Sequence, residues 1–475
     1  MRLGDLLIAA KLVSANEIDR AVQHQNEVGG RFGDSLIATG ALTKQRLERF
    51  LNQIPVEPAS IRATGINPSE LLSLLIKLMY TMRIESVPQF VDALKLPPPV
   101  VEELVAMAID RNLLENRGVS GLTLNYGLSE QGRFWAQDSL KTSLYTGPAP
   151  VTLAEFCARV DLQKVTNESV TFDHIRGALR DYDVTDQFID KIGPALNSGR
   201  AMLLYGPPGN GKTSVALSFA NIFNSVIYMP YAVTIEGQII RVFDPNLHKA
   251  VRPEQASTAN QVISLRREPF DARWVPIYRP FVIAGGELTL EMLDLSYDSA
   301  TGFYEAPMQI KALGGCLVID DFGRQMVNPT TLLNRWIVPM ESRIDYLKLH
   351  TGKSFSVPFE TLLIFSTNLN PEDLMDPAFL RRLSYKLEIG APALPSYRKI
   401  FEKICKRRDI PLTDEAFNII VHKITKEKNS PLAAFQPGFI VDQIISVARF
   451  RGAPPQFDMA AIDYAIDNLK VSTSN

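Results

Sequence analysis

Gly206-Pro207-Pro208-Gly209-Asn210-Gly211-Lys212-Thr213 matches the pattern Gly-x4-Gly-Lys-[Ser/Thr], in which glycines let a loop wrap around phosphate groups. An apolar run of strand type, residues 201–205, precedes this loop, and residues 214–220 follow it with helical spacing. A strand, a glycine turn and a helix start are the context that the pattern requires, because backbone N–H groups then point at phosphate oxygens. The sequence therefore predicts a nucleotide-phosphate site here. The alternative is a glycine turn that binds no nucleotide.

Within this phosphate loop (residues 206–213), Lys212 is expected to reach the β- and γ-phosphates, and the Thr213 hydroxyl is expected to ligate Mg²⁺. The predicted nucleotide-binding residues are those of the loop and the residue after it: Gly206, Pro207, Pro208, Gly209, Asn210, Gly211, Lys212, Thr213 and Ser214.

Length and composition indicate an ordinary globular protein of several domains. The chain has 475 residues, which corresponds to three or four domains of ~100–200 residues each. Hydrophobic residues make up 46% and charged residues 21%. A net charge of -2 gives no overall electrostatic case for binding nucleic acid or a membrane surface. No apolar stretch of ~18 residues is present, so we expect no membrane insertion.

The three cysteines, Cys157, Cys316 and Cys405, are widely separated and form no Cys-x-x-Cys pair. This spacing argues against a disulfide framework and against a zinc site. The N-terminus also lacks the layout of a signal peptide. We therefore expect a cytoplasmic protein in a reducing compartment.

The N-terminal 54 residues contain one unit twice. Residues 2–9 (RLGDLLIA) recur as residues 31–38 (RFGDSLIA), and a Ser14 or Thr43 cap then opens a second amphipathic helix in each unit. Neither unit can bury its apolar face alone. We therefore expect residues 1–54 to form one small helical tandem-repeat domain.

This repeat resembles the tandem N-terminal domain of type II secretion and type IV pilus extension ATPases, in the subset that binds cyclic di-GMP. The resemblance implies that two arginines contact guanine or phosphate, that two glycines permit close backbone approach, and that one glutamine hydrogen-bonds the ligand: Arg2, Arg31, Gly4, Gly33 and Gln25. Lys11 replaces the usual glycine of the first unit, and Ile54 closes the second unit with Gln53 one place early. The alternative is a helical module of this fold that binds only protein.

Residues 60–145 resemble a winged helix-turn-helix domain. Three helical patterns, a hairpin signal around residues 118–121 and a closing helix after Ser129 occur in the order of that fold. The expected recognition helix, residues 99–108, carries Glu102 and Glu103 and no basic residue, whereas a helix that reads a DNA groove presents basic or amide side chains. We therefore favour an interaction or spacer role, and DNA is an unlikely partner.

Two more apolar runs end in polar residues that suit nucleotide hydrolysis. Residues 315–319 are followed by Asp320 and Asp321, and the strand-type run 362–367 is followed by Asn368. A strand that ends in carboxylates places them at the carboxyl edge of a sheet, beside the phosphates. Asp320 is expected to hold Mg²⁺ and Asp321 to polarise the attacking water as the catalytic base. The alternative is a buried strand followed by an acidic turn without a metal.

The order of these motifs, followed by Arg381-Arg382, resembles the AAA+ ATPases over roughly residues 181–452. The resemblance implies that Asn368 is sensor 1, on a strand between the Mg²⁺-binding strand and the loop strand. It implies that Arg381 or Arg382 is an arginine finger that acts on the neighbouring subunit, with the other in an ion pair within the chain. Most AAA+ proteins have Glu at the place of Asp321, so hydrolysis here is expected to be slow or to need a repositioned water.

Other parts of this core carry weaker signals. Lys212 and Asp320 are 108 positions apart, which predicts an insertion, and a hairpin is expected around residues 299–302. Its aromatic residues suit either a pore that grips polypeptide or a hairpin that packs between subunits. Arg273 is expected on the surface. In the helical lid, Gly438 stands where the family has its sensor 2 arginine, with Arg449 as a possible substitute, and Ile192 is a candidate for contact with the base.

Together these signals predict a multidomain α/β protein. Its expected parts are a helical tandem-repeat sensor domain (1–54), a winged-helix-like domain (60–145), an AAA+ core with a parallel sheet (150–391) and a helical lid (392–475). The expected function is that of a hexameric ATPase that uses ATP and Mg²⁺ to remodel an unknown protein substrate under control by cyclic di-GMP. The alternatives are a DNA-associated regulator that uses ATP as an assembly switch, and a nucleotide-binding scaffold without hydrolysis.

Overall fold

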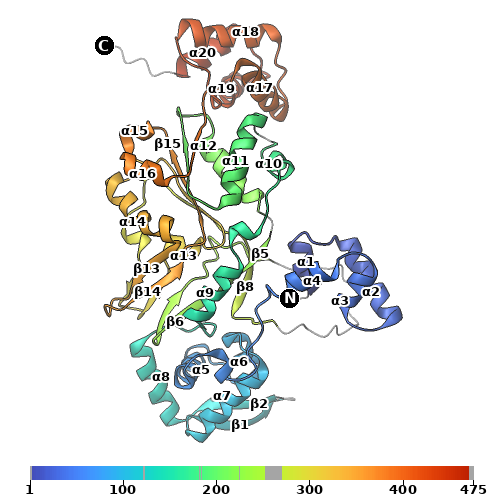
Figure 1. Cartoon of the computed structure of the whole chain (residues 1–475), viewed down its shortest axis with the longest axis vertical. Helices are drawn as coiled ribbons and strands as arrows, with labels where there is room; N and C mark the ends of the chain where they lie inside the picture. Colours follow the sequence, from blue (N-terminus) through green and yellow to red (C-terminus); the bar gives the residue numbers. More distant parts are fainter. Residues whose placement is uncertain are drawn as a thin grey trace.

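The computed structural model describes residues 3–120, 123–180, 182, 184–223, 225–251 and 270–469 (Figure 1). Its centre is a five-stranded sheet in which all neighbouring strands are parallel, in the spatial order β16-β4-β15-β12-β9. The strands are β4 (Met202–Tyr205), β9 (Phe281–Ala284), β12 (Cys316–Ile319), β15 (Leu362–Thr367) and β16 (Tyr385–Glu388). Parallel strands end at one edge of a sheet, so the residues that follow β4, β12 and β15 lie on the same side.

Helices cover both faces of this central sheet, and the apolar runs of the strands explain why. Alternate residues point to opposite faces, so Met202 and Leu204 pack on one side and Leu203 on the other. The first face is covered by α10 (Phe172–Ala178), α11 (Asp186–Ser198) and α12 (Lys212–Ser218). The second is covered by α14 (Pro329–Ser342) and α16 (Pro377–Arg382), with α13 (Met308–Lys311) and α15 (Pro371–Leu374) nearby. Both faces are buried, as continuous apolar strands require.

The N-terminal region forms four helices in two similar units: α1 (Leu3–Ala9), α2 (Ala15–Val28), α3 (Phe32–Ala38) and α4 (Lys44–Leu51). The predicted caps are confirmed, because Ser14 accepts the N–H of Glu17 and Thr43 accepts the N–H of Arg46. This region lies beside β5 and β8 in Figure 1. The guanidinium of Arg159 donates to the Gln53 carbonyl, and the Asp271 N–H donates to the Pro55 carbonyl, so the end of the repeat is tied to the rest of the chain.

The next region contains the predicted three helices and hairpin: α5 (Pro68–Met82), α6 (Val87–Leu94), α7 (Pro98–Asp110), β1 (Leu114–Ser120), β2 (Thr123–Leu128) and α8 (Glu130–Thr142). Residues 121 and 122 of the hairpin lie outside the described residues. The apolar side chains of α7 point into the core of this region, so its exposed face presents Glu102 and Glu103. The Glu103 carboxylate accepts the N–H of Ile61. No Lys or Arg lies on α7 (PPVVEELVAMAID), which weakens the case for groove reading.

The predicted insertion between the phosphate loop and Asp320 is confirmed. It lies between α12 and β9 and forms β5 (Val226–Pro230), β6 (Ala232–Ile235), β7 (Gln238–Arg241) and β8 (Trp274–Tyr278). Strands β5 and β8 pair antiparallel, whereas β6 and β7 join a second five-stranded sheet with β3 (Val151–Thr152), β10 (Ser296–Asp298) and β11 (Phe303–Glu305). A further hairpin follows α14 and consists of β13 (Ile344–Lys348) and β14 (Ser354–Pro358).

The hairpin expected around residues 299–302 is the antiparallel pair β10–β11, and its aromatic residues pack inside the chain. Tyr297 stacks on His350 with ring centroids 4.0 Å apart, and the Tyr304 hydroxyl also hydrogen-bonds His350. Phe303 meets Tyr145 edge to face, with centroids 5.8 Å apart. The three rings therefore pack against partners of the same chain, whereas the two expected roles place them at a pore or between subunits.

Arg273 was expected at the surface, and this expectation is wrong. Its side chain is 1% exposed and lies against Asp271, with Nη2 2.8 Å from Oδ2, while Nη1 donates to the Pro150 carbonyl. Glu155 provides a second carboxylate at 3.5 Å. The arginine is buried because its charge is paired and its N–H groups are satisfied. Residues 252–269, the rest of this stretch, lie outside the described residues.

The C-terminal region, which we call the lid, contains α17 (Leu394–Arg408), α18 (Asp414–His422), α19 (Gln436–Arg451) and α20 (Met459–Leu469). The predicted four helices are confirmed, and their apolar faces form one core. Earlier in the chain, α9 (Leu153–Leu162) packs against β3, β6 and β14. Over the described part of the chain, we find no helix with the length and apolar character that a membrane crossing requires.

Candidate functional site

The phosphate loop connects β4 to α12, and its glycines are required by its backbone. Gly206, Gly209 and Gly211 have φ angles of 140°, 77° and 86°, in the region that favours glycine. A Cβ at Gly206 would also overlap the Ile389 carbonyl beyond β16. Lys212 is 5% exposed, and its Nζ donates to the carbonyls of Gly206 and Pro207 at 2.9 Å each. The ammonium is therefore held under the loop.

The surroundings of Lys212 have two opposite effects on the pKa of its ammonium. Burial lowers the pKa of the Lys212 ammonium, whereas the carboxylates of Asp321 and Asp320 act to raise it. Both carboxylates thus act on the same ammonium from the end of β12. A buried lysine whose hydrogen bonds, within the described part of the chain, go to two carbonyls of the loop is a ready partner for the oxygens of a phosphate chain.

Thr213 and Asp320 meet across the edge of the sheet. The Thr213 hydroxyl lies 2.8 Å from Asp320 Oδ2, although the two residues are 107 positions apart. A hydroxyl and a carboxylate are the hard oxygen donors that Mg²⁺ prefers, and Mg²⁺ commonly completes its six positions with phosphate oxygens and water. Among the residues that the structure describes, no group of three His, Cys, Asp or Glu side chains is placed to hold a metal. The donor set here thus fits a magnesium ion that arrives with a phosphate ligand.

Asp321 and Asn368 form the second pair at this edge. The Asn368 Nδ2 donates to Asp321 Oδ1 at 2.9 Å, and β15 places Asn368 between the phosphate-loop strand and the strand of Asp320. This is the strand order that the AAA+ resemblance implied. Asp321 has φ 47°, a left-handed conformation that Asp tolerates better than most residues. The carboxylate is oriented by an amide donor, an arrangement suited to a general base.

The two adjacent arginines after β15 have different surroundings. Arg382 pairs with Glu341 of α14 and donates to the Ala378 carbonyl at 3.0 Å. Arg381 is exposed. The predicted ion pair within the chain therefore belongs to Arg382, and Arg381 is the better candidate for a finger that reaches another subunit.

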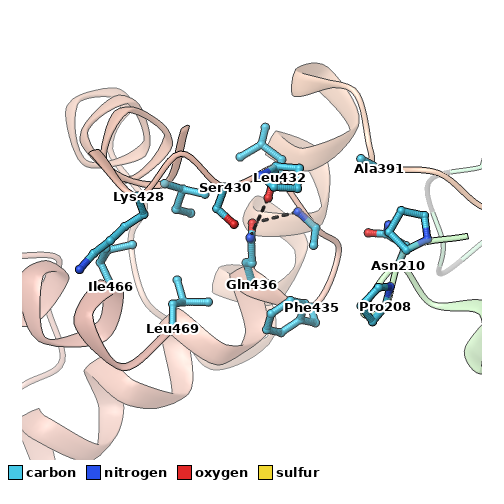
Figure 2. Close-up of a pocket in the computed structure, with 14 residues that line it drawn as sticks. Pro208, Asn210, Ala391, Lys428, Ser430, Leu432, Phe435, Gln436, Ile466 and Leu469 are labelled. Atoms are coloured by element: carbon cyan, nitrogen blue, oxygen red, sulfur yellow. Dashed lines mark hydrogen bonds between the residues drawn. The ribbon is translucent and has the colours of Figure 1, made fainter. Parts of the chain in front are cut away.

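The lid touches the phosphate loop directly (Figure 2). The Phe435 N–H donates to the Gly209 carbonyl at 2.9 Å, and the Ala434 N–H donates to Asn210 Oδ1 at 3.1 Å. The Phe435 ring covers Gly209, whose missing side chain leaves room for it. A cavity of about 220 Å³ lies between loop and lid, lined by Pro207, Pro208, Asn210, Ala391, Ile424, Lys428, Ser430, Pro431, Leu432, Ala433, Phe435, Gln436, Ile466 and Leu469. Asn210 Nδ2 is buried there without a hydrogen-bond partner in the described part of the chain.

Two expectations about this side of the site are corrected. Ile192 of α11 is fully buried in the core on the first face of the central sheet, so its side chain is not available to a nucleotide base. Arg449 lies in the last turn of α19, thirteen residues after the end that meets the loop, which places it about 20 Å away along the helix axis. Arg449 is therefore too far to replace a sensor 2 arginine.

The residues expected to bind a ligand in the N-terminal repeat have structural partners of their own. A Cβ at Gly4 would lie 3.4 Å from Ile18, and a Cβ at Gly33 would lie 3.0 Å from Leu47. Each glycine thus lets the first helix of its unit pack on the second. Arg31 is exposed at the start of α3, and Arg2 lies outside the described residues.

Gln25 is the member of this set with an unused polar atom. Its Nε2 donates to the Gly30 carbonyl at 3.0 Å, whereas its Oε1 is buried without a hydrogen-bond partner among the described residues. A buried acceptor without a partner carries a free-energy cost, which a donor from a ligand would remove.

The comparisons with known proteins add little to this geometry. A family model described as "Domain of unknown function (DUF8689)" matches residues 394–468, which belong to the lid. A comparison with curated proteins gives no match. Solved structures of RuvB from Thermotoga maritima are similar at low scores. One single-substitution mutant has 14% sequence identity and a TM-score of 0.35, with 62% of this chain and 72% of that chain covered.

Two further RuvB structures from this organism have similarly low identity and TM-scores. A second single-substitution mutant has 15% identity and a TM-score of 0.32, and covers 65% of this chain and 73% of its own. The structure titled as the Holliday junction branch migration motor has 15% identity and a TM-score of 0.31 at the same coverage. The interpretation of the site therefore depends on the contacts described above.

Proposed function

We propose that this protein is a Mg²⁺-dependent ATPase of AAA+ type. The observation that carries the proposal is the meeting of two residue pairs beside the buried Lys212. Thr213 lies 2.8 Å from Asp320, and Asn368 lies 2.9 Å from Asp321. Asp320, Asp321 and Asn368 follow the ends of two neighbouring strands, and Thr213 lies in the first turn of α12, which follows the third strand through the phosphate loop. Their side chains suit a metal ligand set and an oriented base at one place.

Each residue has a role that its contacts support. Thr213 and Asp320 would hold Mg²⁺, which would supply positive charge beside the phosphates. Lys212 binds the β- and γ-phosphate oxygens in place of the two carbonyls that it contacts here. Asp321 accepts a proton from the attacking water, and the Asn368 amide keeps that carboxylate in one orientation.

The test is steady-state release of phosphate from Mg-ATP by the full chain. Lys212→Ala is expected to remove turnover, because it removes the ammonium that contacts the Gly206 and Pro207 carbonyls of the loop. Lys348→Ala changes an exposed lysine of β13 and is the matched control. Wild-type protein that binds Mg-ATP without turnover would support the alternative of a nucleotide-binding scaffold.

We propose further that the active unit is a homo-oligomer, a hexamer by the AAA+ resemblance, in which Arg381 completes the site of the next subunit. Arg381→Ala and Lys212→Ala subunits are each expected to be inactive alone. A mixture of them contains junctions with an intact loop on one side and Arg381 on the other. Part of the wild-type turnover should therefore return on mixing, and a mixture that stays inactive would exclude action between subunits.

The N-terminal repeat is proposed to control this activity by binding cyclic di-GMP. The exposed Arg31 supports this proposal, as does the buried Oε1 of Gln25, which has no hydrogen-bond partner among the described residues. Calorimetry on the full chain is expected to detect cyclic di-GMP, with loss of heat in Arg31→Ala and retention in Arg46→Ala, an exposed arginine of α4. The partner that the motor remodels is best sought by co-purification with an Asp321→Asn form that holds ATP.

A further inference from the structure

Gln325 closes the turn that carries the two acidic residues at the end of β12. Its Nε2 donates to the Asp320 carbonyl at 2.9 Å and also lies 3.4 Å from the Gly285 carbonyl, just beyond β9. Its Oε1 accepts the N–H of Gly323 at 2.9 Å. The residue is 9% exposed. Both ends of the side-chain amide are therefore used by backbone groups of this turn, which fixes the conformation of the side chain.

The turn needs such a support because Asp321 has a left-handed backbone. Its φ of 47° is unfavourable for a residue other than glycine, and such a conformation persists only where the surroundings hold it. On the C-terminal side, the Phe322 N–H donates to the Ser366 carbonyl at 2.7 Å, and the Thr367 hydroxyl donates to the Phe322 carbonyl at 2.8 Å. On the N-terminal side, Gln325 holds the Asp320 carbonyl.

We propose that Gln325 is a positioning residue for ATP hydrolysis. The carbonyl that it holds belongs to the peptide between Asp320 and Asp321, so rotation of that peptide moves one carboxylate relative to the other. Asp321 is one methylene shorter than glutamate and compensates less for a displaced backbone. A shift of about 1 Å at a reacting group can lower a rate about 100-fold. This inference rests on the proposed ATPase function.

Two substitutions separate the two ends of the amide. Gln325→Met has a similar shape and loses all three hydrogen bonds of the side-chain amide. Gln325→Glu keeps an acceptor for the Gly323 N–H but loses the donor to the Asp320 and Gly285 carbonyls, so it tests the contact that the proposal depends on. The second substitution also remains informative if the first destabilises the protein.

The chain offers a matched control in Gln163, which follows α9. Its Nε2 donates to the Tyr228 carbonyl at 3.1 Å, and its Oε1 accepts the Tyr228 N–H at 2.6 Å. It is 8% exposed. Gln163→Met therefore removes the same kind of buried bridge, with a comparable loss of stability, in a place away from the four site residues.

The experiment measures kcat and KM for Mg-ATP, the Kd for Mg-ADP and the Tm of the full-length variants. Both Gln325 variants are expected to lower kcat by about 10- to 100-fold. Their Kd for Mg-ADP should stay within about twofold of wild type, since the phosphate loop is unchanged. Gln163→Met should lower Tm and leave kcat unchanged.

A folded Gln325→Glu protein with wild-type kcat would overturn the inference and leave the proposed ATPase function intact. The inference would also be overturned if Gln163→Met lost as much kcat per degree of lowered Tm as the Gln325 variants. General destabilisation would then explain the loss of kcat in all three variants. If wild-type protein shows no turnover, the proposed function fails first, and the positioning role fails with it.

Discussion

The contact between Phe435 and Gly209 makes a prediction that the phosphate loop itself can test. Gly209 and Gly211 have similar left-handed φ angles, 77° and 86°. An alanine Cβ at Gly209 would overlap Cδ1 of the Phe435 ring and lie 3.0 Å from its Cε1, whereas the nearest atom at Gly211 is 4.0 Å away. Alanine at either position therefore carries the same cost of a left-handed backbone. The two positions differ in whether the lid occupies the space that the new Cβ needs.

The magnitudes follow from these two terms. Gly211→Ala should lower the free energy of unfolding by roughly 1–2 kcal/mol, the cost of a left-handed residue with a Cβ. Gly209→Ala should lower it by the same amount plus about 1–3 kcal/mol for overpacking against Phe435. In a Phe435→Ala background the second term should disappear, so the two alanine substitutions should then cost the same.

Urea unfolding of nucleotide-free protein measures these differences. Trp336 is fully buried on one face of the central sheet, so its fluorescence reports on the core once Trp135 and Trp274 are replaced by Phe. Equal costs for the two glycines in the presence of Phe435 would refute the claim that the lid packs on the loop. A difference that persists in the Phe435→Ala background would refute the assignment of that difference to the ring.

Three further predictions follow from single residues. His248 accepts the Asp244 N–H at Nδ1 and donates from Nε2 to the Lys311 carbonyl, and burial lowers the pKa of its imidazole. The free energy of unfolding should therefore fall as pH drops below about 6.5, and His248→Gln should remove this dependence in urea unfolding curves. Burial lowers the pKa of Lys77 to about 8. As pH rises from about 8 to about 10, the wild type should therefore gain stability relative to Lys77→Met, and thermal unfolding at several pH values measures this gain. Arg382→Ala should cost about 0–1 kcal/mol of stability through its partly exposed pair with Glu341, whereas Arg381→Ala should lower kcat in the assembled protein with no change in Tm.

The parts of the site that lie next to a strand could be predicted from the sequence. The phosphate loop, Asp320, Asp321 and Asn368 each directly follow an apolar run, so a local pattern marks them. The order of the strands does not follow from local patterns, and it was expected only because the motifs resemble those of the AAA+ family. The buried strands then explain why the three ends meet at one edge.

Contacts between distant residues could not be predicted in this way. Ala434 and Asn210 are 224 positions apart, and nothing near either residue indicates that the lid reaches the loop. Gln325 lies in a polar turn where its type carries no signal, and its role appears only when its two backbone partners are in place. Arg273 follows the same logic, since a charged residue looks exposed until the carboxylates that neutralise it are folded around it.

In the proposed mechanism, Asp321 is oriented by Asn368 and activates water beside a Mg-ATP bound at the phosphate loop. The most direct measurement is phosphate release in a single turnover with enzyme in excess, for wild type and for Asp321→Asn. The substitution has the same shape and tolerates the same left-handed backbone. Wild-type protein should release phosphate, and Asp321→Asn should bind Mg-ATP with similar affinity but release phosphate at least about 100-fold more slowly. Equal rates in the two proteins would contradict the role of Asp321.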